Sequence, residues 1–285
     1  MATNVGDANF EWVRERDFVR HIQSACDERG VDVEWMSDYW LARLSQQDQE
    51  ACFVLGYNFP LNTASSSKVA SDKSATYCVL QSAGIAAIPH LLIRPDSDGQ
   101  IADTLGSKLD EAGLPAVVKP NSKSGGMGVR RVTSFEEALV TGGDLAKRFG
   151  ALAIGPYVQI EHEYRVVMLD DEPLLSFEKV LSHEAMSESV NGAAGLAKHN
   201  LLAGAKPELI ESDVVIEDLH EIAERTMSEL TLRFASVDIV CVDGELQVLE
   251  VNSAVSLEKF SKSSEDHYHR AGAVYARAVE ACFDK

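Results

Sequence analysis

Hydrophobic and polar positions in the first part of the chain alternate between helical and extended patterns. Apolar side chains recur at helical spacing over residues 10–30, and Gly30 is a typical helix stop. Strands are predicted over 31–35 and 51–56, with a short helix or loop over 40–44 between them. These elements indicate a small N-terminal lobe of mixed helix and strand.

The same alternation continues through the rest of the chain. Ser134 followed three residues later by Glu137 forms a capping box, and the Asp243-Gly244 dipeptide between two apolar runs is typical of a hairpin turn. The pattern as a whole predicts an α/β fold. Helices are predicted over 71–84, 101–111, 134–140, 213–232 and 270–283, strands over 85–93, 116–120, 129–132, 151–159, 163–169, 173–180, 235–242 and 246–251, and a polar loop over 183–200.

Composition and charge narrow the class of protein. The 285 residues exceed the length of a typical single domain, which favours two or three lobes. The net charge of −19, from 26 Lys and Arg against 45 Asp and Glu, argues against a nucleic-acid partner, because binding to phosphate backbones requires a basic face. Any site for an anionic ligand in this chain therefore needs locally convergent cations.

The cysteines and the longest apolar runs indicate a cytoplasmic protein. The five cysteines are scattered without a CxxC pair, so we expect reduced thiols, with neither a zinc site nor a disulfide framework. The N-terminus lacks the pattern of a signal peptide. No apolar run approaches the roughly 20 residues that a transmembrane helix needs. We therefore expect no membrane partner.

A lysine followed by a glycine-rich segment is the first candidate for chemistry. Lys119 ends a short apolar strand and leads into Asn121–Gly128, after which an extended pattern resumes. In such a hairpin the backbone N–H groups can cover phosphates, because glycine permits close approach and positive φ. Neither a Walker A sequence nor a GxGxxG helix opening is present. By itself the segment is equally consistent with a mobile hairpin bearing a solvated lysine.

Three oxygen-bearing side chains on the predicted C-terminal hairpin are the second candidate. Asp238 and Glu250 come close across a hairpin that turns at Asp243-Gly244, and Glu250 and Asn252 project from the same face. Two carboxylates and an amide suit one or two Mg²⁺ ions that also bind phosphates. The alternative is a solvent-facing acidic stripe on an edge strand.

A strand, a short polar break and a second strand over residues 155–166 form the third candidate. A segment of this kind can offer its backbone to an adenine edge and a carboxylate to ribose hydroxyls. In their fixed order, the three segments resemble the ATP-grasp superfamily from about Lys73 to Ser253. The chain is most similar to the carboxylate–amine ligases, the group of D-alanine–D-alanine ligase, the ribosomal-protein glutamate ligases and peptide-forming amino-acid ligases.

The resemblance implies an ATP-grasp fold in which an N-terminal α/β lobe joins two α+β subdomains that enclose the nucleotide. We place the N-terminal substrate-side lobe at 1–93, the central lid subdomain at 94–180, and the C-terminal subdomain with the metal site at 181–285. The implied enzyme uses ATP with Mg²⁺ or Mn²⁺ to join a small-molecule carboxylate, such as an amino acid, to an amine through an acyl phosphate. A homodimer is the family-level expectation.

Two other functions remain open at this point. An ATP-grasp kinase would stop at a stable phosphorylated product, whereas a ligase releases free phosphate and an amide. A regulatory module would bind ATP without turnover, although it has no need for all three predicted metal ligands.

The resemblance also assigns roles to individual residues. Asn200 is assigned near the phosphates or the metal, in a segment that also contains His199, and Arg165 is a candidate for stabilising the acyl phosphate. The implied metal ligands are Asp238, Glu250 and Asn252, and the implied catalytic residues are Lys119, Lys179, Asn200 and Arg165. The implied nucleotide-binding residues are Lys73, Lys119, Ser124, Gly125, Gly126, Gly128, Tyr157, Val158, Glu163 and Lys179.

The chain departs from the family pattern at three places. Ser236 stands where D-alanine–D-alanine ligases have an arginine, and either Arg165 or Arg233 is a candidate replacement. Pro156 occupies the position of a common acidic residue at the adenine hinge. The segment Asn58–Asn62 stands in place of an N-terminal glycine-rich substrate motif, so the substrates themselves do not transfer from the family.

Overall fold

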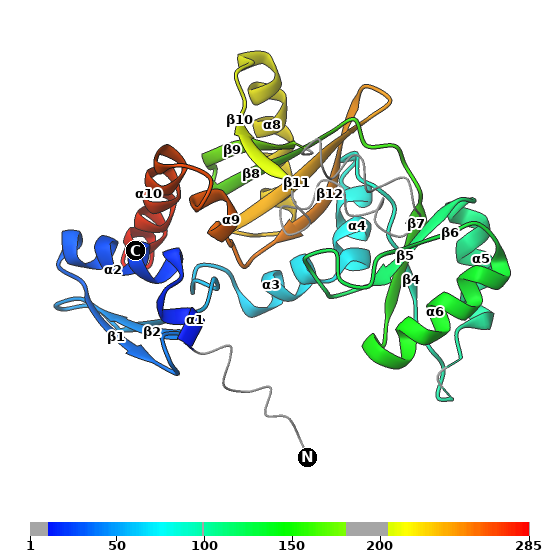
Figure 1. Ribbon diagram of the computed structural model, residues 1–285, viewed down its shortest axis with the longest axis horizontal. Helices are drawn as coiled ribbons and strands as arrows, with labels where there is room; N and C mark the ends of the chain where they lie inside the picture. The colour runs from blue at the N-terminus through cyan, green and yellow to red at the C-terminus, as the bar shows by residue number, and fades with distance from the viewer. Residues whose placement is uncertain (1–10, 99, 181–204, 285) are drawn as a thin grey trace.

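Three antiparallel sheets organise the chain in a computed structural model that describes residues 11–98, 100–180 and 205–284 (Figure 1). A three-stranded sheet belongs to the N-terminal lobe, a four-stranded sheet to the central part, and a five-stranded sheet to the C-terminal part. The lobe and the four-stranded sheet lie at opposite ends of the long axis, with the five-stranded sheet between them (Figure 1).

The N-terminal lobe consists of two helices and a meander of three strands. Gly30, at a φ of 64°, ends the second helix as predicted. The prediction of a short helix or loop over 40–44 was wrong, because Ala42 and Leu44 alternate with polar or exposed neighbours and bury one face of a strand. The elements are α1 (Glu11–Arg14), α2 (Asp17–Arg29), β1 (Asp32–Met36), β2 (Leu41–Ser45) and β3 (Cys52–Leu55).

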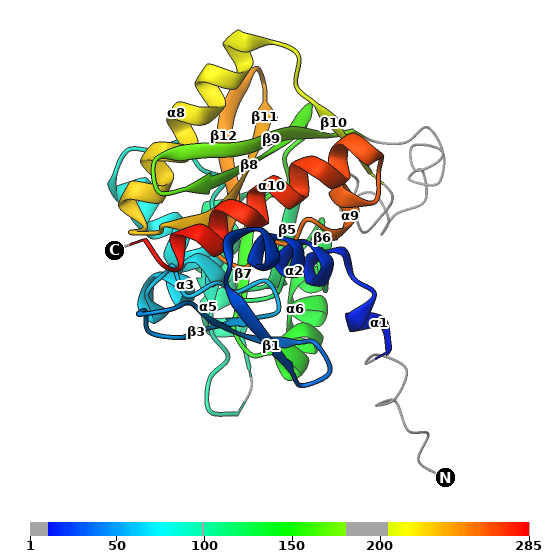
Figure 2. The same ribbon diagram turned by 90° about the vertical axis from the view of Figure 1, so that its left-hand side faces the viewer.

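The C-terminal helix α10 (Glu265–Ala281) completes the core of this N-terminal lobe. It lies across α2, as the two views show (Figures 1 and 2). Phe18 and Ile22 of α2 share a buried cluster with Tyr275 of α10. The short helix α9 (Glu258–Ser261) adds a cap, since the Glu258 carboxylate accepts the backbone N–H groups of Asp17 and Phe18 at the start of α2.

Two consecutive helices lead from the lobe into the central part. Only the second, α4 (Lys73–Ser82), was predicted, and the Asp72 side chain caps its start. The serine-rich segment before it forms α3 (Ala64–Ser71), whose first turn is capped by Thr63. Serine and threonine favour caps over helix interiors, which is why local propensity missed this helix.

The central part is a four-stranded sheet covered by two helices. The strand order is β4-β7-β5-β6, and a buried aliphatic cluster joins the sheet to both helices. Pro89 interrupts the predicted strand over 85–93, so only its last part is extended in the sheet. The elements are β4 (Leu91–Ile93), α5 (Ala102–Ala112), β5 (Ala116–Pro120), β6 (Arg130–Val132), α6 (Phe135–Phe149) and β7 (Leu152–Pro156).

The C-terminal part is a five-stranded sheet in the order β10-β9-β8-β11-β12. The predicted turn at Asp243-Gly244 is confirmed, with a positive φ at both residues. The sheet groups 162–180 with the C-terminal strands, and the proposed boundaries after 93 and 180 stay predictions. The elements are β8 (His162–Leu169), β9 (Glu172–Val180), β10 (Lys206–Leu209), α8 (Asp213–Glu229), β11 (Phe234–Val242) and β12 (Glu245–Asn252).

The two faces of the five-stranded sheet differ in chemistry. On one face, side chains such as Val166 and Val237 pack against the buried side of α8. On the other face, Val167, Phe177 and Phe234 join the cluster that includes α9 and α10. Because side chains alternate along each strand, Arg165, Lys179 and Asp238 share this second face. One end of the face is therefore apolar and covered by helices, and the other is charged.

No helix in the described ranges combines the length and the apolar character that crossing a bilayer requires.

Candidate active site

The charged end of the sheet face is set by strand register. Asp238 of β11 lies directly opposite Arg165 of β8 on one side and Glu250 of β12 on the other. A β-bulge follows Asp238, and beyond it the pairing with β12 shifts by one residue. Three strands thus place an arginine and two carboxylates in one row. The predicted closeness of Asp238 and Glu250 is the direct result of this pairing.

A buried ion network centres on Asp238, whose side chain is 1% exposed. Arg165 donates from Nε and Nη2 to the two carboxylate oxygens at 2.7 Å each, and Lys179 Nζ lies 3.0 Å from Oδ2. Lys179 also donates to Glu163 at 2.5 Å. Burial alone would raise the pKa of Asp238, but the two cations hold that pKa well below its ordinary value. Asp238 is therefore an anion at neutral pH.

The network gives Arg165 and Lys179 a common role. Burial would lower the pKa of Arg165, but the Asp238 carboxylate raises it above its ordinary value. A buried charge is tolerated only when it is paired and hydrogen-bonded. The predicted catalytic residues Arg165 and Lys179 are thus held in fixed positions by the predicted metal ligand Asp238 and the predicted ribose ligand Glu163.

Glu250 connects this row to the first predicted nucleotide lysine. Its carboxylate lies 3.7 Å from Lys73 Nζ and accepts a hydrogen bond from Asn252 Nδ2 at 3.3 Å. Lys73 is at the start of α4, and its Nζ also donates to the backbone carbonyl of Lys123. Lys73 therefore bridges β12 and the glycine-rich segment, two parts of the chain that the ATP-grasp resemblance places on either side of the nucleotide.

Lys119 lies on β5, near two residues, Asn121 and Lys73, that are joined by a hydrogen bond. The Lys73 backbone N–H donates to the Asn121 carbonyl at 3.1 Å, and the Asn121 side chain accepts from Ser74. Burial lowers the pKa of Lys119 to about 8, Glu250 opposes this shift, and Lys73 adds to it. Lys73 and Lys119 thus both place positive charge near Glu250. An anion bound there would reduce the repulsion between the two lysines.

The glycine-rich segment has the backbone conformation that was predicted for it. Gly125, Gly126 and Gly128 have φ values of 69°, 73° and 73°. At Gly128 a Cβ atom would also lie 2.9 Å from Cγ of Pro120, closer than real side chains approach. Both constraints require glycine here. The segment is a tight turn that continues directly from the strand carrying Lys119.

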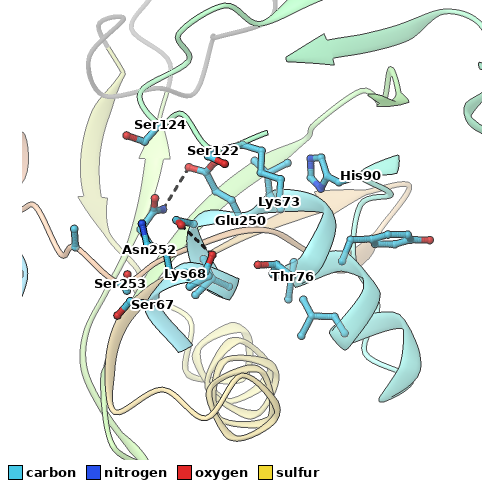
Figure 3. Close-up of a pocket in the computed structure, with 18 of the residues that line it drawn as sticks. Ser67, Lys68, Lys73, Thr76, His90, Ser122, Ser124, Glu250, Asn252 and Ser253 are labelled. Carbon is cyan, nitrogen blue, oxygen red and sulfur yellow. Dashed lines mark hydrogen bonds and ion pairs between the residues drawn. The ribbon is translucent and has the colours of Figure 1, made fainter. Parts of the chain in front are cut away.

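A pocket of about 320 Å³ opens where these elements meet (Figure 3). Of the residues that were predicted to bind phosphates or a metal, Lys73, Ser124, Glu250 and Asn252 line it. Among the described residues, the buried network of Arg165, Glu163, Lys179 and Asp238 is absent from the pocket lining, as are Lys119, Gly125, Gly126, Gly128, Tyr157 and Val158.

The pocket-lining residues that sequence patterns missed include Lys68 and His90. Lys68 is on the unpredicted helix α3. His90 is 4% exposed, and burial together with Lys119 and Lys73 holds its pKa well below the ordinary value, so the ring is neutral. The signal for His90 was present, because a histidine inside the apolar run 85–93 is unusual.

Comparisons with known proteins agree with this geometry. A family model for the RimK-like ATP-grasp domain matches residues 180–268, which include Asp238, Glu250 and Asn252. D-alanine–D-alanine ligase from Bacillus anthracis, solved with ATP, is similar with a TM-score of 0.57 at 20% identity, over 77% of this chain and 67% of that one. No curated protein sequence matches the chain.

Two further solved structures show the same similarity. The D-alanine–D-alanine ligase from Coxiella burnetii has a TM-score of 0.57 at 16% identity, over 78% of this chain and 59% of that one. The ATP-grasp ligase PsnB, solved with a minimal precursor, has a TM-score of 0.50 at 16% identity, over 76% and 64%. The chain has an ATP-grasp fold. The resemblance to the ATP-grasp superfamily that was stated from the sequence is thereby confirmed at the level of the fold.

The adenine hinge of the ATP-grasp fold was assigned to Tyr157 and Val158. The Tyr157 backbone N–H donates to the Pro115 carbonyl at 2.9 Å, and its ring lies 4.7 Å from the guanidinium carbon of Arg131. Val158 packs against an apolar cluster of Ile88, Val240 and Val242, and Ile88 also lines the pocket. The role of both hinge residues stays a prediction.

Of the two arginines proposed to replace the one missing at Ser236, only Arg165 is in the site. Arg233 pairs with Asp170 at 2.7 Å, and both side chains are 45% exposed. Ser236 lies on the same face as Asp238 and directly opposite Asn252. Asn200 and His199 lie outside the described residues.

Proposed function

We propose that the protein is an ATP-dependent carboxylate–amine ligase that forms an amide through an acyl phosphate. The observation that carries this proposal is the charged row on one sheet face, where Asp238 pairs across strands with both Arg165 and Glu250. Lys73 joins that row to the glycine-rich turn. The geometry supports one anionic ligand between the turn and the sheet.

The lysines and the turn would hold the triphosphate of ATP. Lys73 and Lys119 would provide positive charge near Glu250, and Ser124 with the following glycines would provide backbone N–H donors. A bound polyphosphate would favour the protonated form of Lys119, whose pKa of about 8 lies near neutrality. These cations offset the repulsion between ATP and a chain of net charge −19.

The donor set at the sheet edge fits a divalent cation. The Asn252 amide donates to Glu250 through its nitrogen, which leaves its carbonyl oxygen to bind a metal. Asp238 accepts three hydrogen bonds or ion contacts and retains capacity for one more partner. Ser236 Oγ, opposite Asn252, is buried without a hydrogen-bond partner among the described residues. Asp238, Glu250 and Asn252 would hold Mg²⁺, which supplies charge neutralisation to the phosphates.

The reaction would proceed in two displacements. An oxygen of the substrate carboxylate attacks the γ-phosphorus of ATP, and the bond to the ADP oxygen breaks. The amine nitrogen then attacks the acyl carbon, loses a proton, and expels inorganic phosphate. Arg165 and Lys179 would stabilise the charge on the transferred phosphoryl group. Closure of Asn121–Gly128 would exclude water, which otherwise hydrolyses the acyl phosphate.

Product analysis tests the proposal. The full chain is incubated with ATP, MgCl₂ and pairs of amino acids, and ADP, free phosphate and the amide are quantified by coupled assay and mass spectrometry. The ligase proposal requires the three products in equal amounts for at least one pair. A phosphorylated small molecule without free phosphate would identify a kinase instead, and tight ATP binding without turnover would identify a regulatory module.

The cellular location, the substrates and the oligomeric state of the enzyme are also proposals. We place the enzyme in the cytoplasm, acting on a small-molecule carboxylate such as an amino acid and on a small-molecule amine. A homodimer remains the expected oligomeric state, and sedimentation of the purified chain tests it.

A further inference from the structure

The pocket has a second wall that neither the nucleotide nor the metal assignment uses. Ser67 and Lys68 of α3 line it together with Asn58 from the N-terminal lobe and Ser253, which follows β12. Figure 3 shows Ser67, Lys68 and Ser253 on the side of the pocket away from His90. The segment Asn58–Asn62, expected in place of the substrate motif, thus reaches the pocket through Asn58.

Some charged side chains that line the pocket have an ion-pair partner, and others have none among the described residues. Glu250 is the one carboxylate among the described lining residues, and it is in contact with Lys73. Lys68 is exposed at the pocket and has no ion pair within the described part of the chain. Acidic residues outnumber basic ones 45 to 26 in this protein. A lysine left without a carboxylate at such a place favours an anionic ligand.

The backbone that carries Lys68 is held firmly against the C-terminal sheet. Asn62, just before α3, accepts the N–H groups of Arg233 and Phe234 and donates to the Phe234 carbonyl. Ser66 exchanges a hydrogen bond with Thr231 at 2.8 Å. The start of α3 is therefore fixed relative to β11. A lysine on a fixed helix loses less entropy on binding a ligand than one on a free loop.

Lys68 and Lys73 line the pocket from two different helices. Lys68 belongs to α3, and Lys73 begins α4 after the chain turns at Asp72, which ends one helix and caps the next. Lys73 contacts Glu250 and the glycine-rich segment, where phosphates are expected. The carboxylate that reacts has to meet the γ-phosphate at that end. Because Lys68 takes no part in these contacts of Lys73, it is free to bind a second anion that does not react.

We propose that Lys68, with Ser67 and Asn58 beside it, binds a carboxylate of the substrate that is not consumed in the reaction. This inference rests on the proposed ligase function and names its substrate class: one of the two substrates carries an additional carboxylate. The Asn58 side chain donates to the Leu55 carbonyl at 3.2 Å, which fixes the amide. Lys68 provides the charge that distinguishes a carboxylate from a neutral carboxamide.

A comparison of carboxylate and carboxamide substrates tests this assignment. For each amino-acid pair that the wild type joins, one non-reacting carboxylate at a time is replaced by its carboxamide, first on the acid substrate and then on the amine substrate. The partner whose replacement raises KM carries the recognised group. In Lys68→Ala we expect KM for the carboxylate form to rise about tenfold or more, with kcat nearly unchanged and KM for the carboxamide unaffected.

Three further variants separate recognition from folding. Lys68→Arg keeps the charge and should retain most of the preference for the carboxylate, whereas Lys68→Gln should lose it. Lys147→Ala removes an exposed lysine of α6, paired with Asp144, and should behave as the wild type. The dissociation constant for ATP should be the same in all of them. Equal changes of KM for carboxylate and carboxamide in Lys68→Ala would overturn the assignment.

Failure of the ligase proposal would be distinguishable from failure of this one. If the wild type joins no pair, binding of succinate and glutarate is measured by calorimetry with ADP and MgCl₂ present, together with the half-amide of each acid. Stronger binding of the diacids that is lost in Lys68→Gln would support a carboxylate site. Absent binding, or binding that is unchanged in Lys68→Gln, would overturn it.

Discussion

Arg165 lies directly opposite Asp238 across the β8–β11 pair, and its guanidinium contacts both oxygens of that buried carboxylate at 2.7 Å. Ser236 stands where the ATP-grasp resemblance expects an arginine, and we propose that Arg165 supplies the positive charge to this sheet face from the neighbouring strand. The stability of the site and its proposed chemistry therefore both involve this pair.

Removal of Arg165 should destabilise the fold as well as stop turnover. Arg165→Ala leaves the Asp238 carboxylate buried with one cation fewer, which costs about 3 kcal/mol of unfolding free energy. Arg233→Ala is the matched control, because its pair with Asp170 is half exposed and should cost less than about 1 kcal/mol. Urea unfolding of the two variants measures both values. Equal losses would contradict a special role for the buried pair.

Lys119→Ala and Glu250→Gln should abolish ATP turnover while the fold stays intact. The lysine supplies charge to the phosphates, and the glutamine keeps the shape of Glu250 without its metal-binding charge. ADP formation and circular dichroism are measured on the same samples. Near-normal ADP formation in either variant would count against the assignment of the site.

The affinity for ATP should weaken above pH 8. Burial places the pKa of Lys119 at about 8, so the free protein loses this positive charge as pH rises through that value. KM for ATP should then rise by up to about tenfold per pH unit. Lys119→Arg stays charged throughout and should give a flat profile over pH 7–9, roughly the range around this pKa. A steep rise in that variant would assign the dependence to another group.

The lowered pKa of Lys119 should make the protein more stable as pH rises, although the affinity for ATP falls. Lys119 has a folded-state pKa of about 8 against an ordinary value of 10.5, so the unfolded chain binds more protons between these two values. The contribution of Lys119 to unfolding free energy should therefore increase as pH rises from 8 to 10.5. Comparison with Lys119→Met, which removes the titration, isolates this contribution from other groups.

Gly128→Ala should slow turnover and lower stability by about 1 kcal/mol or more, because the residue has a positive φ and its Cβ would meet Pro120. Gly143→Ala on α6 is the control: its Cβ would meet nothing within 4 Å, and alanine favours a helix by about 0.5–1 kcal/mol. Steady-state kinetics and thermal unfolding measure both. A Gly128→Ala variant with normal kcat would contradict a role for the turn in closure.

Local patterns in the sequence were sufficient for most elements and for the pieces of the site. The Asp243-Gly244 turn and the Glu250–Asn252 spacing follow from neighbouring residues alone, so they could be predicted. The contact of Arg165 with Asp238 could not, because it depends on the register of strands 73 positions apart. Lys68 was missed for a related reason: α3 is stabilised by Thr63, Asn62 and Thr231 rather than by its own propensity.

The packing of α10 on α2 constrains how this chain acquires its structure. Phe18 and Ile22 bury themselves against Tyr275, and the start of α2 depends on the Glu258 carboxylate. During synthesis the first lobe consequently stays incomplete until the entire nucleotide-binding sheet has been translated. Such distant contacts slow folding and expose apolar surface in the meantime. Fragments that stop before α9 would be substrates for chaperones and proteases, even with every proposed catalytic residue in place.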